Sequence, residues 1–238
     1  HHRETKEITL SFRQEGIHLS CLFHTYFLKM LFIVVTNPYF IDNEHIIIQN
    51  LIDYGVDYVH LRKPEANINE YKDLLSSLDE KTLNHIVLHD YHELALYYPV
   101  HGIHLNRRNT LIPKGYNKKI SCSTHSLDEI RRLPDYFEYC FLSPIFDSIS
   151  KSGYLSRFNN EELLEPDINQ LINKRVIALG GVTYNKIEEL NNMHFHGFAM
   201  LGDIMNKVGN HDFEQYVRKI DERRKSLSAY GGSQNNNI

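Results

Sequence analysis

Eight short runs rich in apolar and β-branched residues alternate with runs patterned as helices, and this alternation constrains the fold more than any other feature of the sequence. The predicted strands are Leu31–Thr36, Tyr58–Lys63, His85–Asp90, Gly102–Asn106, Lys119–His125, Tyr139–Phe146, Arg175–Gly180 and Gly197–Leu201. Eight βα units of this size favour a single-domain α/β fold, the (β/α)8 TIM barrel. A doubly wound open sheet would carry a glycine fingerprint after its first strand. Asn37-Pro38 stands there without a glycine, so we predict the closed barrel.

Helical patterns fill most of the connections between these strands. The predicted helices are Glu44–Tyr54, Asn69–Leu78, Tyr91–Tyr98, Leu127–Leu133, Glu161–Asn173, Tyr184–Asn192 and Asp212–Lys225. Asn67 and Thr183 precede two of them and have side chains able to cap free N–H groups. The connection 107–117 contains Pro113 and Gly115, so we expect its helix to be short or missing.

The barrel is assigned to residues 30–225, because Met30 directly precedes the first predicted strand. Residues 1–29 are treated as a non-core N-terminal extension, and residues 226–238 are predicted to be a disordered tail. The apolar stretch Cys21–Val35 is interrupted by polar residues and lacks a small-residue cleavage site. It therefore matches neither a signal peptide nor a membrane span.

The composition excludes some classes of partner. A net charge of −4 over 238 residues gives no general attraction to nucleic acid or to an anionic membrane. The three cysteines, Cys21, Cys122 and Cys140, have no metal-ligand spacing, so we expect free thiols in a reducing, cytoplasmic setting. The sequence is compatible with a homodimer but does not indicate one.

Two glycine-terminated strands predict a phosphate site. The run Arg175–Thr183 contains Gly180-Gly181, and Gly197–Asp203 contains Gly202. In parallel barrels the loops after the last two strands commonly bind phosphate, since glycine lets backbone N–H groups approach the oxygens closely. A tight turn between strand and helix would be the purely structural alternative.

The other predicted strand ends carry cations, hydroxyls and imidazoles but only two carboxylates. They include Thr36, His60, Arg62, Lys63, His89, Asp90, His104, Asn106, Ser123, His125, Ser143, Ser148, Ser150, Lys151 and Asp203. Because the C-terminal ends of barrel strands surround the active site, this set favours a small anionic, phosphorylated ligand. The histidines are also open to a simpler interpretation as packed, hydrogen-bonded barrel residues. Arg107-Arg108 is most simply interpreted as surface charge.

From about Leu31 to Lys219 the chain resembles the thiamine phosphate synthase family and its TenI-like relatives. The matching motifs are Val59-His-Leu-Arg-Lys-Pro64, Leu88-His-Asp90, Gly102-Ile-His-Leu105, Ser123-Thr-His-Ser126, Leu142-Ser-Pro-Ile-Phe146 with Ser148-Ile-Ser-Lys151, and Ala178-Leu-Gly-Gly181. The resemblance implies an enzyme that joins a hydroxymethylpyrimidine diphosphate to a hydroxyethylthiazole phosphate, releasing pyrophosphate with the help of Mg²⁺.

The resemblance also implies roles for individual residues. Arg62, Ser123 and Lys151 are expected at the pyrimidine diphosphate, and Asp90 with Asn109 at the metal. Ser148, Ser150, Gly180, Gly181, Leu201 and Gly202 are expected at the thiazole phosphate. We add His125 as a candidate catalytic residue, and His60, Lys63, His89 and His104 as candidate substrate-binding residues.

Several positions depart from the synthase pattern. Asn109 occupies the place of a second acidic metal ligand, and the family's Asn-Asp-Arg becomes His89-Asp90-Tyr91. The family's Gln-Leu-Arg-Glu-Lys becomes His60-Leu-Arg-Lys-Pro64, which moves the lysine one place earlier. Because side chains alternate between the two faces of a strand, this shift would place the Lys63 side chain on the opposite face from the family's lysine. The shortened fourth crossover is a further departure.

These departures keep two other hypotheses open. One is a TenI-like thiazole phosphate tautomerase, although the histidine of that branch is replaced here by Pro144, so His125 or His104 would have to serve. The other is a non-catalytic binder of thiazole or thiamine phosphates. Asp90 could also act as a helix cap rather than a metal ligand.

Overall fold

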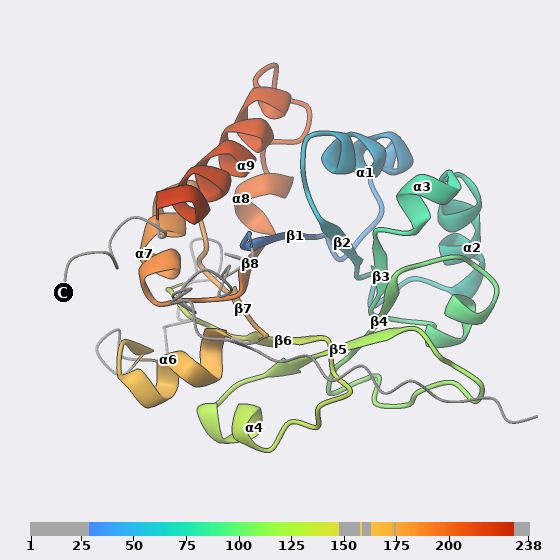
Figure 1. The fold of residues 1–238 in the computed structure, drawn as a ribbon. Coiled ribbons are helices and arrows are strands. Elements are labelled where there is room, and N and C mark those ends of the chain that lie inside the picture. Colours follow the sequence, from blue (N-terminus) through green and yellow to red (C-terminus); the bar gives the residue numbers. More distant parts are fainter. Residues whose placement is uncertain (1–28, 148–157, 159–162, 174, 231–238) are drawn as a thin grey trace, which may run out of the picture.

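The computed structural model describes residues 29–147, 158, 163–173 and 175–230, and within them the predicted barrel is confirmed. Eight parallel strands pair in the order β1 to β8 and close when β8 pairs with β1 (Figure 1). The strands are β1 (Leu31–Val35), β2 (Tyr58–Leu61), β3 (Ile86–Leu88), β4 (Gly102–Leu105), β5 (Lys119–Thr124), β6 (Tyr139–Leu142), β7 (Val176–Leu179) and β8 (Gly197–Met200). All lie within the predicted strands. Most end earlier, because the last predicted residues belong to the mouth of the barrel.

Helices surround this barrel (Figure 1). The α-helices are α1 (Glu44–Asp53), α2 (Ile68–Ser76), α3 (Glu80–Leu83), α4 (Leu127–Arg131), α6 (Pro166–Asn173), α7 (Ile187–Asn192), α8 (Gly202–Met205) and α9 (Phe213–Tyr230), and the 3₁₀ helices are η2 (His92–Leu96) and η3 (Tyr184–Lys186). As predicted, no helix forms between residues 107 and 117. None of the helices in the described ranges is long and apolar enough to cross a lipid bilayer.

The helix termini test three of the sequence predictions. Asn67 caps α2 in a full capping box with Glu70, as its position predicted. Thr183 makes no side-chain cap, because the chain enters a 3₁₀ turn there. The predicted start of a tail at residue 226 is wrong, since α9 continues to Tyr230. The residues from 226 to 230 contain no helix breaker, and the first glycine comes directly after Tyr230.

Strand alternation divides the buried residues into two sets. Side chains that face outward pack under the helices and form the larger apolar core. The inward-facing apolar set is small and consists of Ile33, Val35, Tyr139, Phe141, Ile177 and Ala199. These residues lie on β1, β6, β7 and β8, so this side of the interior is apolar. The inward side chains of β2 to β5 are largely polar, and the candidate site lies there.

A buried arginine joins α9 to the end of the barrel opposite the mouth. The guanidinium of Arg224 is fully buried and donates to the backbone oxygens of Met30 at 2.8 Å and Gly55 at 2.6 Å. It also pairs with the carboxylates of Asp221 and Asp57. Since these partners come from the start of β1, the segment before β2 and α9 itself, one side chain holds together segments far apart in the sequence.

Replacing Arg224 by alanine should therefore lower the free energy of unfolding by about 3–5 kcal/mol, because buried carboxylates and carbonyls lose their partner. Arg223→Ala is the matched control. Arg223 pairs with Glu188 at the surface, so its loss should cost at most about 1 kcal/mol. Urea denaturation of the two variants measures the difference, and equal losses would contradict this assignment.

Candidate active site

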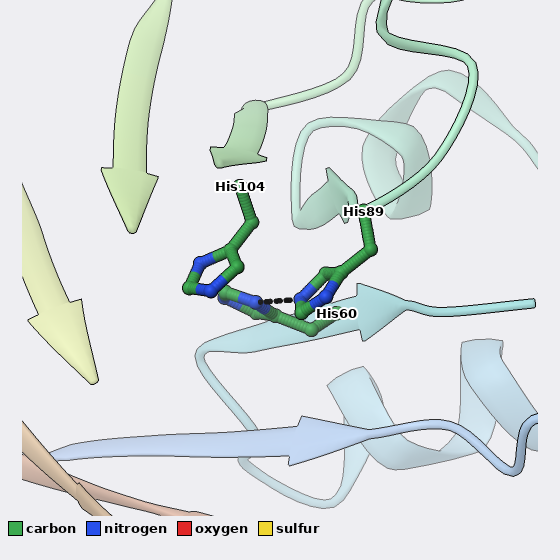
Figure 2. Close-up of side chains that lie close together, drawn as sticks. All are labelled: His60, His89 and His104. Atoms are coloured by element: carbon green, nitrogen blue, oxygen red, sulfur yellow. Dashed lines mark hydrogen bonds between the residues drawn. The ribbon is translucent and has the colours of Figure 1, made fainter. Parts of the chain in front are cut away.

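Three histidines from neighbouring strands meet inside the barrel (Figure 2). His60 comes from β2, His89 follows β3 and His104 belongs to β4, and all three side chains are buried. His60 Nδ1 lies 2.8 Å from His89 Nε2, and the rings of His89 and His104 stack with centroids 4.2 Å apart. Alternation along three adjacent parallel strands thus places the imidazoles in one cluster, here called the histidine cluster.

Hydroxyl groups surround the histidine cluster. Tyr139 OH lies 2.8 Å from His60 Nε2. His104 lies between two serines, with Nδ1 2.9 Å from Ser121 Oγ and Nε2 2.8 Å from Ser123 Oγ. Ser123 was expected at the pyrimidine diphosphate as a catalytic candidate with Arg62 and Lys151, whereas the roles of Tyr139 and Ser121 were not predicted. Their inward orientation follows from alternation, but their contact with particular histidines depends on how the barrel closes.

Burial keeps the three imidazoles neutral. Loss of hydration lowers the pKa of His60 and His89 well below the usual value and that of His104 to about 3. Neighbouring histidines add to the effect in each case. Near neutral pH these residues therefore offer lone pairs and N–H donors rather than positive charge.

Asp90 is held by four donors instead of capping a helix. Its Oδ2 accepts from the Lys63 backbone N–H at 3.0 Å and from Tyr71 OH at 2.9 Å. Its Oδ1 accepts from Asn109 Nδ2 at 2.8 Å and Arg108 Nη2 at 3.3 Å. The following η2 helix begins after Tyr91 without a side-chain cap, so the capping alternative is wrong.

Asn109 is not oriented as a metal ligand. Its Nδ2 donates both to Asp90 Oδ1 and to the backbone oxygen of His89, each at 2.8 Å, which fixes the amide with its nitrogen toward Asp90. Mg²⁺ prefers oxygen ligands and usually takes one or two carboxylates. Here Asp90 supplies one carboxylate, already paired with a guanidinium. In this arrangement Asp90 and Asn109 do not fit a two-ligand Mg²⁺ site.

Two arginines supply positive charge beside Asp90. The Arg62 side chain is half-buried, and its guanidinium makes no hydrogen bond or ion pair with any residue in the described ranges. Burial lowers its pKa, and the nearby positive charge of Arg108 lowers it further. Arg108 is exposed, as the interpretation as surface charge has it, and it also contacts Asp90, which was not predicted. Its place directly after the fourth strand end was the only sequence signal.

A cavity of about 530 Å³ opens next to Asp90 and Arg108. It is lined by Lys63, Pro64, Ala66, Asp90, Tyr91, His92, Glu93, Arg108, Asn109, Thr110, Leu111 and Pro113. The connection between β4 and β5 forms much of one wall. Because that connection contains no helix, its extended backbone leaves room beside Asp90.

Lys63 lies on the opposite face from Arg62, as strand alternation predicted. Its Nζ is buried and donates to Glu44 Oε1 at 2.6 Å and to the backbone oxygens of Asn37 and Tyr39. The ammonium is thus fully occupied between the barrel and α1. We therefore remove Lys63 from the candidate substrate-binding residues.

The loop after β7 contains two glycines with positive φ that lie against the residues following β6. Gly180 and Gly181 have φ angles of 94° and 64°, and a Cβ atom at Gly181 would lie 2.4 Å from the backbone oxygen of Asp147. Glycine is thus required by both conformation and close approach. The N–H of Gly181 makes no hydrogen bond with a described residue and is free to donate. Leu201 and Gly202 lie after the neighbouring strand β8, where α8 begins.

His125 lies half-buried at the end of β5. Its Nδ1 is 3.0 Å from the backbone oxygen of Ser143, which can only accept, so Nδ1 carries the proton. Nε2 then carries a lone pair. The predicted site residues Ser148, Ser150 and Lys151 lie outside the described ranges.

Replacing Lys63 by alanine should mainly reduce the stability of the protein, whereas replacing the adjacent Arg62 should mainly reduce its affinity for pyrophosphate. Lys63→Ala leaves the buried Glu44 carboxylate without its ammonium partner and should lower the free energy of unfolding by about 3–5 kcal/mol. Arg62→Ala breaks no pair and should cost at most about 1 kcal/mol, but it should weaken pyrophosphate binding roughly 10-fold or more, since a charged hydrogen bond is lost. Urea denaturation and titration calorimetry measure the two effects. A stability loss for Arg62→Ala as large as for Lys63→Ala would contradict these placements.

The buried histidines should make stability pH-dependent. Their folded pKa values lie below the unfolded value of about 6.5, so the unfolded chain binds more protons and stability falls as pH drops from 6.5 toward about 3. Between pH 7 and pH 5 each histidine should remove roughly 2 kcal/mol. The double variant His60→Gln/His89→Asn should lose less over this interval. Denaturation with a chelator present tests this, and identical pH slopes would show that the cluster is not the cause.

Comparison with known proteins agrees with this geometry. A family model described as thiamine monophosphate synthase matches residues 31–204. A thiamine-phosphate synthase of Clostridium tetani (strain Massachusetts / E88) is 22% identical over 170 residues, covering 68% of this chain and 80% of that protein. The solved thiamine phosphate pyrophosphorylase of Bacteroides thetaiotaomicron is 33% identical with a TM-score of 0.74, covering 83% of this chain and 98% of the other.

A second solved structure, thiamine phosphate pyrophosphorylase from Pyrococcus furiosus, is 16% identical with a TM-score of 0.67, which supports the fold alone; the match covers 84% of this chain and 98% of the other. The family model spans every strand of the barrel. It therefore includes the histidine cluster, Asp90 and the loop after β7. The chain belongs to the thiamine monophosphate synthase family.

Proposed function

We propose that this protein is a thiamine phosphate synthase, joining hydroxymethylpyrimidine diphosphate to hydroxyethylthiazole phosphate with release of pyrophosphate. The observation that carries the proposal is the half-buried guanidinium of Arg62, which lies at the end of β2 without a hydrogen-bonding partner among the described residues. A half-buried cation near Asp90 and Arg108, with no hydrogen-bonding partner in the described ranges, is suited to an anionic substrate group.

The diphosphate is assigned to the side of the mouth near Asp90. Arg62 and Arg108 supply positive charge there, and Asp90 fixes the Arg108 side chain through their ion pair. As the bond between the pyrimidine methylene carbon and the diphosphate oxygen breaks, its electron pair leaves with pyrophosphate. The two guanidinium groups stabilise this developing charge. Lys151 is assigned to the same group from the family resemblance.

The thiazole phosphate is assigned to the loops after β7 and β8. The free N–H of Gly181 would donate to a phosphate oxygen, with Gly180, Leu201 and Gly202 shaping the loops. Ser148 and Ser150 are added from the resemblance. With its phosphate held there, the thiazole nitrogen is positioned to attack the methylene carbon and form the new C–N bond. Holding both substrates in this orientation supplies much of the acceleration.

The histidine cluster and Ser123 form the floor between the two anion sites. Because His60, His89 and His104 are neutral, they do not compete with the arginines for phosphate. Both ring nitrogens of His60 and of His104 already have partners, so we assign the contact with the uncharged part of the pyrimidine to Ser123, which His104 orients. His125 lies at the adjacent strand end.

A thiazole phosphate tautomerase is the second candidate, and one observation favours it. The Ser143 carbonyl holds the proton on His125 Nδ1, so Nε2 is left as a base. A base at the barrel mouth can take a proton from one position of a thiazole phosphate tautomer, and the resulting acid can return it at another position of the ring. This reaction needs no diphosphate, so it predicts that Arg62 is dispensable.

The two activities are separated by assaying purified protein with three variants. For a synthase, thiamine phosphate and pyrophosphate should form in equal amounts from the two substrates, and Arg62→Ala should lower kcat/KM roughly 100-fold. Arg131→Ala, at the exposed C-terminal end of α4, is the control and should have no effect. For a tautomerase, His125→Ala should abolish thiazole interconversion while Arg62→Ala leaves it intact. Saturable binding of thiazole phosphate without either reaction would identify a non-catalytic binder.

Asn109→Asp tests the metal requirement. The new carboxylate would face Asp90 in place of an amide donor, so the two negative charges would repel in the absence of a cation. Adding Mg²⁺ should then raise the melting temperature and the synthase rate of this variant more than those of the native protein. Asn109→Ala removes the same donor without adding charge and should show no such gain. An equal response to Mg²⁺ in all three proteins would show that this position does not face the metal.

A further inference from the structure

We propose that His60, His89 and His104 bind one divalent transition-metal ion of the zinc class inside the barrel. This site is separate from the Mg²⁺ position discussed for Asp90, and it does not depend on the synthase reaction. It uses nitrogen ligands from β2, from the residue that follows β3 and from β4 (Figure 2).

The spacing of the ring nitrogens supports a shared ion. One nitrogen from each histidine lies within 4.8 Å of those from the other two, and all three residues are buried. In a tetrahedral zinc site, Zn–N distances near 2.0–2.1 Å place the nitrogens about 3.3 Å apart. His60 Nδ1 and His89 Nε2 are 2.8 Å apart in the structure, so the distance between these two nitrogens would have to increase by about half an ångström.

The remaining ring nitrogens have partners that suit metal-bound histidines. Such ligands usually donate their second N–H to an oxygen, which fixes the tautomer and the ring orientation. If His60 binds through Nδ1, its Nε2–H can donate to Tyr139 OH. If His104 binds through Nε2, its Nδ1–H can donate to Ser121 Oγ. Two of the three ligands therefore already have such a partner.

The donor set also selects the class of ion. Neutral imidazoles suit zinc, copper, nickel and iron, whereas Mg²⁺ and Ca²⁺ require oxygen ligands. Three nitrogens leave a fourth position for water or a bound molecule, as in catalytic zinc sites. Because the imidazoles are neutral at physiological pH, binding would not have to displace protons from imidazolium groups.

Binding requires one ring to tilt. The rings of His89 and His104 are stacked within 14° of parallel, and lone pairs in parallel planes do not converge on one ion. A rotation of His104 away from this stack would break its contact with Ser123 and keep the contact with Ser121. A purely hydrogen-bonded cluster, with no ion, is the alternative that the experiment must exclude.

The test uses the full chain, stripped of metal and titrated with Co²⁺ as the probe. The expected result is one Co²⁺ per chain, the visible absorption of a tetrahedral site, displacement by Zn²⁺ and a higher melting temperature with metal. His60→Gln/His89→Asn should lose at least roughly 100-fold in affinity and the metal-dependent rise in melting temperature. These replacements restore the residue types that the family resemblance expects, which favours folding, and circular dichroism checks it.

Two further variants complete the test. His211→Ala removes an exposed histidine outside the cluster and should leave Co²⁺ binding unchanged. Tyr139→Phe removes the hydroxyl beside His60 and should weaken binding roughly 10-fold. The proposal is overturned if the native protein binds no stoichiometric Co²⁺, or if the folded double variant binds it as tightly. Failure here would leave the synthase assay with Arg62→Ala unaffected, so the two proposals are separable.

Discussion

Closure of the eight-stranded ring is the constraint on which the rest of this structure depends. Each strand has hydrogen-bonded neighbours on both sides, so no strand can slip without breaking two ladders. Alternate side chains are therefore fixed as inward or outward. Arg62 and Lys63 show the consequence most clearly. The Arg62 guanidinium has no hydrogen-bonding partner in the part of the chain that the structure describes, whereas the Lys63 ammonium is buried against Glu44.

The interior of the barrel is apolar on one side and polar on the other, and the candidate active site lies on the polar side. Apolar side chains from β1 and β6 to β8 pack on one side, whereas imidazoles and hydroxyls from β2 to β5 fill the other. A polar interior is stable only if its groups find partners. Tyr139, Ser121 and Ser123 provide these partners for two of the histidines, which allows a polar floor without buried charge.

Asp90 directly follows His89 of the histidine cluster and joins the cluster to residues at the mouth of the barrel. It accepts from groups on two different connections, including the Tyr71 hydroxyl of α2 between β2 and β3 and the Arg108 guanidinium between β4 and β5. Within the thiamine monophosphate synthase family, this chain thus places a guanidinium and an amide nitrogen around the carboxylate that the resemblance assigns to a metal. Among the described residues, Arg62 and Arg108 supply positive charge on this side of the mouth, and the Arg108 guanidinium is held by its ion pair with Asp90.

The sequence by itself determined the eight strands, the closed barrel, the helixless connection before β5 and the strand-end position of the site residues. These follow from local periodicity and from glycine and proline, which act over a few residues. It did not determine the end of α9, the ion pair of Arg108 with Asp90, or the direction of the Asn109 amide. It also left open which hydroxyl each histidine contacts.

Only the tertiary structure decided these points, because each depends on groups brought together by closure from distant parts of the chain. Tyr139 and His60 are separated by 79 residues, yet they meet across the interior. Alternation predicts that both point inward, but the diameter and stagger of the closed ring decide that they touch.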